Sequence, residues 1–154
     1  MIYSATTEYA IRALAHMATL EPGERILARD LAAATGVPRQ FLGKILHRLA
    51  RLDLLDSAKG RGGGFRFNRK SDEISVADVV QAVEGGDISK QCVLGLDECN
   101  DQQPCPMHDQ WVSFRTALMD RVYAMSIADL GKNLSAKRTL HGDLVQRAAD
   151  EGDA

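Results

Sequence analysis

Two short helical patterns joined by a glycine-containing turn occupy residues 28–52, and they constrain the fold more than any other feature of the chain. The first pattern runs from about Ala28 to Thr35 and ends at Gly36, a residue typical of helix C-caps. Pro38 then suits the start of the next helix. That helix has an apolar face, formed by Phe41, Ile45, Leu46, Leu49 and Leu52, and an opposite polar face, formed by Arg39, Gln40, Lys44, His47, Arg48 and Arg51. The pattern predicts a helix-turn-helix with a basic outer face.

A glycine-rich hairpin is predicted directly after this helix pair. Residues 54–59 and 65–70 suit its two strands, and Gly60–Gly64 suits its tip, where Lys59 and Arg61 supply positive charge. Glycines let the backbone of such a tip approach another molecule closely. The tip lacks the Lys-Ser/Thr pair of a phosphate-binding P-loop, so a nucleic acid is the better partner. With the hairpin, the pattern becomes a winged helix-turn-helix.

Helical periodicity extends the fold on both sides of this element. A first helix is predicted between Tyr3 and Thr19, and another from the Ser75 cap to the Gly85 stop. Residues 26 and 27 suit a short strand or a hydrophobic staple. The predicted fold class is mainly α with a small β-hairpin.

A long amphipathic helix is predicted to start at Pro106 and to run for about 25 residues. Its apolar positions are spaced three, four, four and three residues apart, at Trp111, Phe114, Leu118, Val122 and Met125. Such a seam pairs with another copy of the helix or packs on its own domain. We expect a homodimer, because DNA readers of this kind commonly match a palindromic site with a two-fold axis.

The net charge of −2 conceals two parts of opposite sign. Residues 1–70 hold 12 Lys and Arg against 6 Asp and Glu, a net +6, whereas the remainder holds 7 against 15, a net −8. A basic segment of this kind favours a polyanionic partner such as double-stranded DNA.

The predicted DNA contacts come from the second helix of the pair and from the hairpin. That helix would lie in the major groove, where Arg39 and Gln40, near its N-terminus, suit base edges. The hairpin cations suit phosphates or the minor groove. The full set of predicted DNA-binding residues is Arg39, Gln40, Lys44, His47, Arg48, Lys59 and Arg61.

The three cysteines of the chain, Cys92, Cys99 and Cys105, lie together in one Gly- and Asp-containing stretch that no helix or strand pattern claims. Three is an odd number, which excludes a closed set of disulfides. Thiolates gathered on one loop suit a soft metal or an iron-sulfur cluster. A structural zinc site usually has closer ligand pairs than these, so an iron-sulfur cluster is the better match.

Four segments together resemble the Rrf2 family of bacterial winged-helix regulators, which includes the IscR and NsrR regulators. They are Glu8–Leu14, Gly36–Pro38 before Phe41 and Leu42, the hairpin tip Gly60–Phe65, and the cysteine segment that ends in Cys105-Pro106-Met107-His108. The resemblance spans about residues 1–132. It implies a homodimer crossing through its long helices, an iron-sulfur cluster near the dimer interface, and DNA affinity that depends on the cluster.

Three thiolates leave one coordination position for a different ligand. His108 is one candidate, because it lies one helical turn beyond Cys105 and resembles the IscR branch. The partner subunit's Glu8 is the other, because the resemblance to the nitric-oxide-sensing branch implies a carboxylate from the first helix. The two candidates point to different subfamilies, so both a [2Fe-2S] and a [4Fe-4S] cluster remain open.

The sequence predicts a dimeric DNA-binding regulator that senses redox state, nitric oxide or iron-sulfur status. The alternative is a cluster-free or zinc-stabilised repressor that responds to a metabolite or a partner protein. An electron-transfer protein would leave the basic helix-turn-helix unused, and no histidine and acid are arranged around one nucleophilic cysteine as in a thiol enzyme.

The domains expected are a winged helix-turn-helix over 1–85, a cluster-binding loop over 86–105, a dimerisation helix and its end over 106–132, and a disordered tail over 133–154. No apolar run approaches a membrane span and no secretory signal opens the chain. We therefore expect a cytoplasmic protein.

Overall fold

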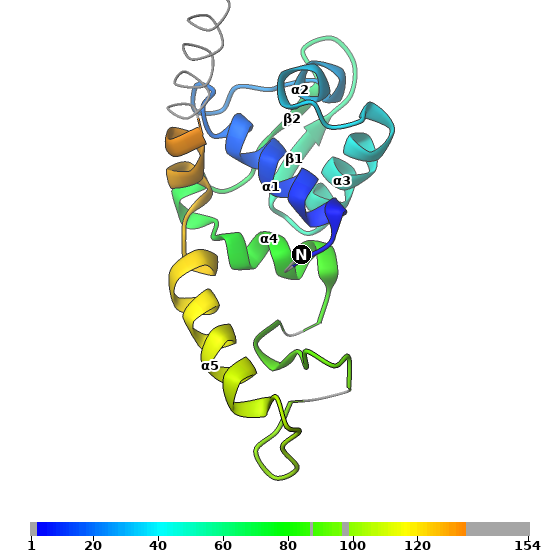
Figure 1. The fold of residues 1–154 in the computed structure, drawn as a ribbon. Helices are drawn as coiled ribbons and strands as arrows, with labels where there is room; N and C mark the ends of the chain where they lie inside the picture. Colours follow the sequence, from blue (N-terminus) through cyan, green and yellow to red (C-terminus); the bar gives the residue numbers. More distant parts are fainter. Residues whose placement is uncertain (1–2, 87, 97–98, 135–154) are drawn as a thin grey trace, which may run out of the picture.

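The computed structural model describes residues 3–86, 88–96 and 99–134, and most helices gather in an N-terminal part that we call the head. The head contains helices α1 (Ala5–Met17), α2 (Ala28–Thr35), α3 (Arg39–Arg51) and α4 (Val76–Glu84), and the hairpin of β1 (Leu55–Ala58) and β2 (Gly64–Phe67). The cysteine-bearing segment leads away from the head, and helix α5 (His108–Leu118) runs back beside it towards the head (Figure 1). Two short 3-10 turns, η1 (Ser71–Glu73) and η2 (Ile88–Lys90), flank α4.

The helix-turn-helix forms as the sequence predicts. Gly36 ends α2 with a φ of 69°, a left-handed conformation that glycine adopts without steric cost, and Pro38 is the N-cap of α3. The inner face of α3 is buried in the core through Leu42, Ile45, Leu46 and Leu49. Phe41 and Leu52, predicted on the same apolar face, are instead about half exposed, because they lie at the rim of the contact rather than at its centre.

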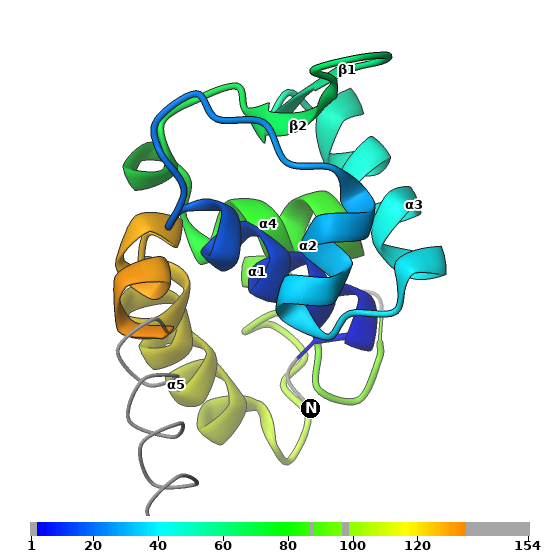
Figure 2. The same cartoon turned by 90° about the horizontal axis from the view of Figure 1, so that it is seen from above.

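The hairpin projects beyond α3 (Figure 2). Its strands are antiparallel, and Leu55 is paired with Phe67 at the base. Nearer the tip, the backbones of Ile26 and Phe65 exchange two hydrogen bonds of 2.9 Å, so residue 26, predicted as a short strand or a staple, forms an isolated β-bridge that joins β2 to the segment before α2. Arg25 adds a 3.1 Å hydrogen bond to the carbonyl of Gly64.

An ion pair on the outer side of the hairpin also involves Arg25. The guanidinium of Arg25 donates to the carboxylate of Asp56, and that of Arg66 donates to the same oxygen at 3.0 Å. The hydrogen bond from Arg25 is the main reason that the pKa of Asp56 is lowered, although partial burial of the carboxyl opposes the shift. The hairpin is therefore held to the segment before α2 by both backbone and charged side chains.

Helix α5 is shorter than the sequence predicts. Its α-helical part ends at Leu118, and a single π-helical stretch, η3 (Met119–Tyr123), continues it, so a helix of about 25 residues starting at Pro106 is wrong. The chain then pairs with the segment before α4, because Ile127 donates to Ile74 at 2.8 Å and Val76 donates to Met125 at 2.9 Å. These long-range hydrogen bonds end the helix.

A last helical segment covers residues 127–134 and packs on α1. A Cβ added at Gly131 would lie 2.7 Å from the carbonyl oxygen of Ala15, so the two helices approach closely at this glycine. Residues 133 and 134, which the sequence analysis assigned to the tail, belong to this helix, whereas 135–154 lie outside the described residues.

Candidate nucleic-acid interface and thiol loop

The outer face of α3 is free of the core over its whole length. Every residue predicted there as a DNA contact is exposed, namely Arg39, Gln40, Lys44, His47 and Arg48. A shallow groove follows this face towards β1, lined by Gln40, Gly43, Lys44, His47, Ala50, Arg51 and Ser57. The groove has polar and cationic side chains along its edges, as contact with phosphates and base edges requires.

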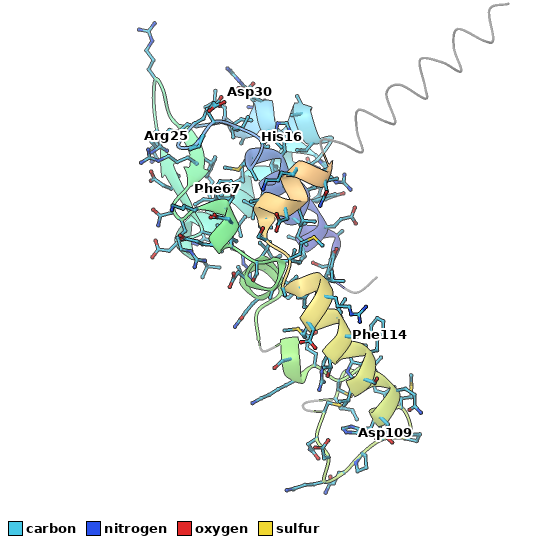
Figure 3. All side chains as sticks on the ribbon, turned by 90° about the vertical axis from the view of Figure 1, so that its left-hand side faces the viewer. His16, Arg25, Asp30, Phe67, Asp109 and Phe114 are labelled. Atoms are coloured by element: carbon cyan, nitrogen blue, oxygen red, sulfur yellow. The ribbon has the colours of Figure 1, made fainter. Side chains whose placement is uncertain are left out.

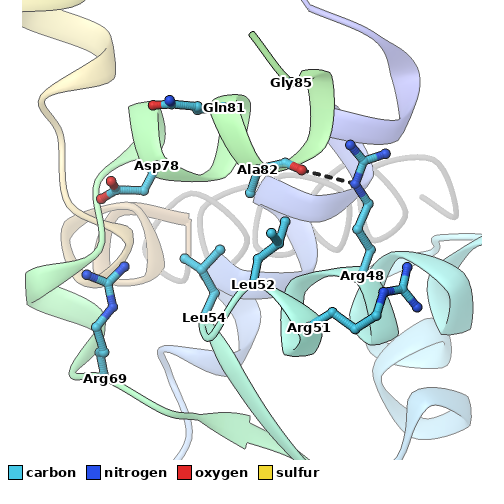
Figure 4. A pocket seen from close by; sticks show the side chains of 9 residues that line it. All are labelled: Arg48, Arg51, Leu52, Leu54, Arg69, Asp78, Gln81, Ala82 and Gly85. Atoms are coloured by element: carbon cyan, nitrogen blue, oxygen red, sulfur yellow. Dashed lines mark hydrogen bonds between the residues drawn. The ribbon is translucent and has the colours of Figure 1, made fainter. Parts of the chain in front are cut away.

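Two of these residues also make contacts within the chain. The ring of His47 meets the ring of Phe65 edge-on, with 5.1 Å between the ring centroids, so α3 and the hairpin touch at this point. The Nε of Arg48 donates to the carbonyl oxygen of Ala82 at 3.0 Å, as Figure 4 shows. This hydrogen bond of Arg48 thus links α3 to α4.

A second hollow lies between α3 and α4, beside the Arg48 contact (Figure 4). Leu52 and Leu54 line its centre, and Arg48, Arg51 and Arg69 supply positive charge around it. Arg51 lies on the predicted polar face of α3, whereas Arg69 is not among the predicted DNA contacts. Its signal in the sequence is the cation-rich run that begins in β2 and continues past it, with Arg66, Arg69 and Lys70.

The hairpin tip carries the remaining predicted DNA contacts. Lys59 and Arg61 are both exposed, and Gly60 and Gly62 beside them have φ angles of 82° and 76°. These positive φ angles turn the backbone sharply at a position that few other residues would accept. The tip therefore presents two cations on a narrow backbone loop.

The thiol loop, residues 86–105, carries three free and half-buried cysteines, Cys92, Cys99 and Cys105. Backbone hydrogen bonds shape it locally, with the Gly95 amide donating to Cys92 at 3.1 Å and the Cys99 amide donating to Lys90 at 3.3 Å. Beyond η2, the described residues of the loop form turns and irregular backbone.

His108 is the best-placed nitrogen ligand beside these thiols. It begins α5, is only 6% exposed, and its Nδ1 lies 3.3 Å from the Sγ of Cys99. Its Nε2 lies 2.8 Å from a carboxylate oxygen of Asp101. A carboxylate on the far ring nitrogen is a common way to orient a histidine ligand.

Glu8, the other candidate fourth ligand, lies on the first turn of α1. Its half-exposed carboxylate forms an ion pair with Arg12, whose guanidinium lies 5.9 Å from the ring centroid of Tyr9. Glu8 is therefore accessible to another chain but already has a cationic neighbour.

The donor types of the loop suit an iron-sulfur centre, because three free thiols and one imidazole lie within one segment. Cys99 and His108 are already neighbours. Among the residues that the structure describes, however, no three Cys, His, Asp or Glu side chains converge closely enough to hold a single metal ion. Coordination by all three cysteines would require the loop to bring Cys92 and Cys105 towards this pair.

The predicted dimerisation seam is divided between two environments. Leu118 is buried in the core of its own chain and Trp111 is half-buried, whereas Phe114, Val122 and Met125 are 51%, 44% and 37% exposed. Figure 3 shows Phe114 and Asp109 on α5, away from the part of the head that carries Arg25 and Asp30. An apolar strip on a helix outside the head is available for contact with another surface.

The head, with its basic outer helix and cationic hairpin, defines a winged helix-turn-helix DNA-binding protein. The chain belongs to the Rrf2 family, described as iron-dependent transcriptional regulators, which it matches over residues 3–133. It is a DNA-binding transcriptional regulator, and its relatives are regulators rather than enzymes.

Individual relatives agree with this assignment. A protein of Aquifex aeolicus, assigned as an HTH-type transcriptional regulator, is 30% identical over 132 residues, which are 84% of this chain and 91% of the relative. A Mycobacterium tuberculosis protein with the same type of assignment is 36% identical over 131 residues, covering 84% of this chain and 81% of that one.

Two solved structures of regulators, CymR and IscR, have a similar fold. CymR of B. subtilis, the global cysteine regulator, has a TM-score of 0.71 at 21% identity, over 84% of this chain and 95% of its own. IscR of T. potens has a TM-score of 0.68 at 18% identity, over 85% of this chain and 86% of its own. At this identity the likeness shows the fold alone. No helix among the described residues is long and apolar enough to cross a membrane.

Proposed function

We propose that this regulator binds a palindromic DNA operator as a homodimer and changes its DNA affinity with the state of an iron-sulfur cluster. The cluster would be held by Cys92, Cys99 and Cys105, with His108 or the partner subunit's Glu8 as fourth ligand. The observation that carries the proposal is the pairing of a buried, carboxylate-oriented His108, at the start of α5, with Cys99 of the loop that contains every cysteine of the chain. The loop is joined directly to α4, which packs on α1 and α3 of the head.

The proposed DNA contacts follow from exposure and charge. Arg39 and Gln40, at the start of α3, would read base edges, and Lys44, His47 and Arg48 would lie along the same groove. Lys59 and Arg61 would reach the backbone or the minor groove from the hairpin. Phe114, Val122 and Met125 supply the exposed apolar strip for the second copy, with Trp111 and Leu118 supporting it from within the chain.

When bound, an iron-sulfur cluster would supply a redox-active and nitric-oxide-reactive centre, in either the [2Fe-2S] or the [4Fe-4S] form. The thiols must stay reduced to hold it, which accords with the cytoplasmic location expected from the sequence. The division into a DNA-binding domain over 1–85, a cluster loop over 86–105 and a dimerisation segment over 106–132 belongs to the same proposal.

A cluster-free or zinc-stabilised repressor that responds to a metabolite or a partner protein is the second candidate. Its cluster-free form accords with the described residues, among which no three metal ligands converge. It also accords with the fold likeness to CymR, whose name refers to cysteine rather than to iron.

The deciding experiment is an absorption spectrum of the protein purified without oxygen, with assays for iron and acid-labile sulfide. The proposal expects visible charge-transfer bands, matching iron and sulfide, and a change in DNA affinity after exposure to air or nitric oxide. The Cys99→Ala variant should lose this response. A colourless protein that binds zinc or no metal, yet still binds DNA, would leave the second candidate.

A further inference from the structure

One face of α5 is turned towards the thiol loop. His108, Trp111 and Arg115 are spaced three and four residues apart, so they lie along one side of the helix. His108 contacts Cys99, as described above. Trp111 and Arg115 contact the other end of the loop, at the residue before Cys92.

Both contacts converge on a single carbonyl oxygen. The indole Nε1 of Trp111 donates to the carbonyl oxygen of Gln91 at 2.7 Å, and a guanidinium nitrogen of Arg115 donates to the same atom at 2.9 Å. A carbonyl oxygen has two lone pairs, so these two donors use its full capacity. The charge of the arginine makes its hydrogen bond the stronger of the two.

The ring of Trp111 is itself held by a neighbour on α5. It stacks on Phe114 with 5.8 Å between the ring centroids and an interplanar angle of 30°. This contact fixes the direction of the indole N–H, so the hydrogen bond to Gln91 is made by a preorganised donor. Trp111, predicted as part of the dimerisation seam, therefore forms a hydrogen bond within its own chain.

We propose that Trp111 and Arg115 are positioning residues for the cluster loop, which hold the backbone at Gln91, next to Cys92, against α5 while His108 contacts Cys99. We call these two residues the loop anchor. The inference rests on the proposed function for its purpose, although the anchor itself is a property of the chain. Holding the loop at these two places on α5 lowers the conformational entropy that it loses when Cys92 and Cys105 are brought to the Cys99–His108 pair.

Hydrogen exchange of the metal-free, full-length protein tests the anchor without any cluster. Trp111→Phe keeps the aromatic stacking but removes the N–H donor, and Arg115→Gln removes the charge. We expect amides in a peptide covering residues 88–96 to exchange about five- to tenfold faster in either variant, the effect of losing one hydrogen bond. Peptides from α1 and α3 should be unchanged.

Arg121→Gln is the matched control, because Arg121 is an exposed arginine in η3, on the same helical run, and forms no hydrogen bond or ion pair with the thiol loop among the described residues. Its loop should exchange at the wild-type rate. Equal loop exchange in all three variants and the wild type would overturn the anchor.

Cluster retention tests whether the loop anchor helps the loop to hold a cluster. After reconstitution without oxygen, iron and sulfide content and the decay of the visible bands in a chelator should show several-fold faster loss from Trp111→Phe and Arg115→Gln than from Arg121→Gln. If the wild type and all three variants take up the cluster and lose it at the same rate, the positioning role is overturned. A wild type that takes up no cluster would overturn the proposed function and this purpose together, while the exchange experiment would still decide whether the anchor exists.

Discussion

Glu84, the last residue of α4, links the segment that leads into the thiol loop to the start of α1. Its carboxylate accepts a hydrogen bond from the buried hydroxyl of Thr7 and another from the backbone amide of Ser4 at 2.8 Å. Partial burial tends to raise the pKa of this carboxyl, but these hydrogen bonds and the nearby charge of Arg48 outweigh it, and the pKa is lowered from its ordinary value of 4.5.

Because the pKa of Glu84 is lower in the folded state than in the unfolded state, its contribution to stability is present above about pH 4.5. It is lost as the pH falls through the lowered value. We expect Glu84→Gln to reduce the free energy of unfolding at pH 7 by about 1 kcal/mol, after allowance for solvent screening of this partly exposed group. Urea midpoints measured from pH 7 to pH 3 should show a constant difference above about pH 4.5 and a shrinking one below it.

The control for this experiment is Glu73→Gln, which changes an exposed carboxyl in η1. It should leave the stability near that of the wild type at each pH. If Glu84→Gln and the wild type differ by the same amount at every pH, the ionised carboxylate is not the stabilising group.

Substitution of Gly43 tests the stability of α3 and its contact with DNA separately. This glycine lies in the interior of α3 and lines the groove on the outer face, where an added Cβ would meet no atom within 4 Å. Gly43→Ala should therefore raise the free energy of unfolding by about 0.5–1 kcal/mol, since glycine costs about this much in a helix interior. Chemical unfolding measures this directly.

The same substitution should weaken DNA binding if α3 lies deep in the major groove, because the added methyl group would project towards the bases. Fluorescence anisotropy with labelled operator DNA measures this affinity. A variant that is more stable and binds DNA as tightly as the wild type would contradict close approach of α3 at this position.

At the scale of elements, the head could be predicted from the sequence because its boundaries are set by local chemistry. Gly36 ends α2, Pro38 starts α3, and the capping box of Ser75 and Asp78 starts α4, each by a rule that spans a few residues. The end of α5 could not be predicted in this way. It is set by backbone pairing of residues 125–127 with 74–76, some fifty positions earlier, which no local pattern indicates.

In the candidate site, too, features set by local sequence could be predicted and long-range contacts could not. The cysteines and the exposed cations of α3 were identified from residue type and spacing alone. The hydrogen bonds from Trp111 and Arg115 to Gln91 were not, because a backbone carbonyl carries no signal in the sequence. The apolar seam predicted that Trp111 was a dimerisation residue, since periodicity reports that a residue is apolar but not which surface it meets.

Gly64 brings the hairpin backbone close to the segment before α2. A Cβ added there would lie 2.6 Å from the carbonyl oxygen of Ile26, and the φ of 116° is itself unfavourable for other residues. Gly64→Ala should break the bridge between Ile26 and Phe65 and destabilise the protein by about 1–3 kcal/mol. Thermal unfolding and DNA affinity should both decline.

Gly62→Asn is the matched control for the hairpin. Its φ is 76°, which asparagine tolerates better than other non-glycine residues, and an added Cβ would meet no atom within 4 Å. Its stability should stay close to that of the wild type. Equal losses of stability in Gly62→Asn and Gly64→Ala would show that the conformation of the tip, and not the bridge to Ile26, supports the hairpin.

At the scale of the whole molecule, positive charge is concentrated in residues 1–70, which include α1–α3 and the hairpin, and negative charge in the rest of the chain. The net +6 of residues 1–70 would attract DNA to this part, and the net −8 of the remainder would reduce the attraction of DNA to the other parts. DNA affinity should therefore fall steeply with salt, with a slope set by the number of phosphates that the head contacts. A dimer that places two heads on one operator doubles that number.

Phe114→Asp tests this relation between assembly and DNA binding. Phe114 is 51% exposed on α5, so a carboxylate there should leave the chain folded but disfavour an apolar interface with a second copy. Light scattering should show a monomer, and the slope of log affinity against log salt should fall to about half of the wild-type value. Circular dichroism checks that the helices persist.

Leu118→Ala provides the contrast, because Leu118 is 8% exposed and packs in the core of its own chain. It should cost about 2–5 kcal/mol of stability, as other buried leucines do, yet keep the dimer and the full salt slope at temperatures where the protein is folded. If Phe114→Asp remained a dimer with an unchanged salt slope, the two copies would have to meet on another surface. The exposed strip of Phe114, Val122 and Met125 would then be free to bind a different partner.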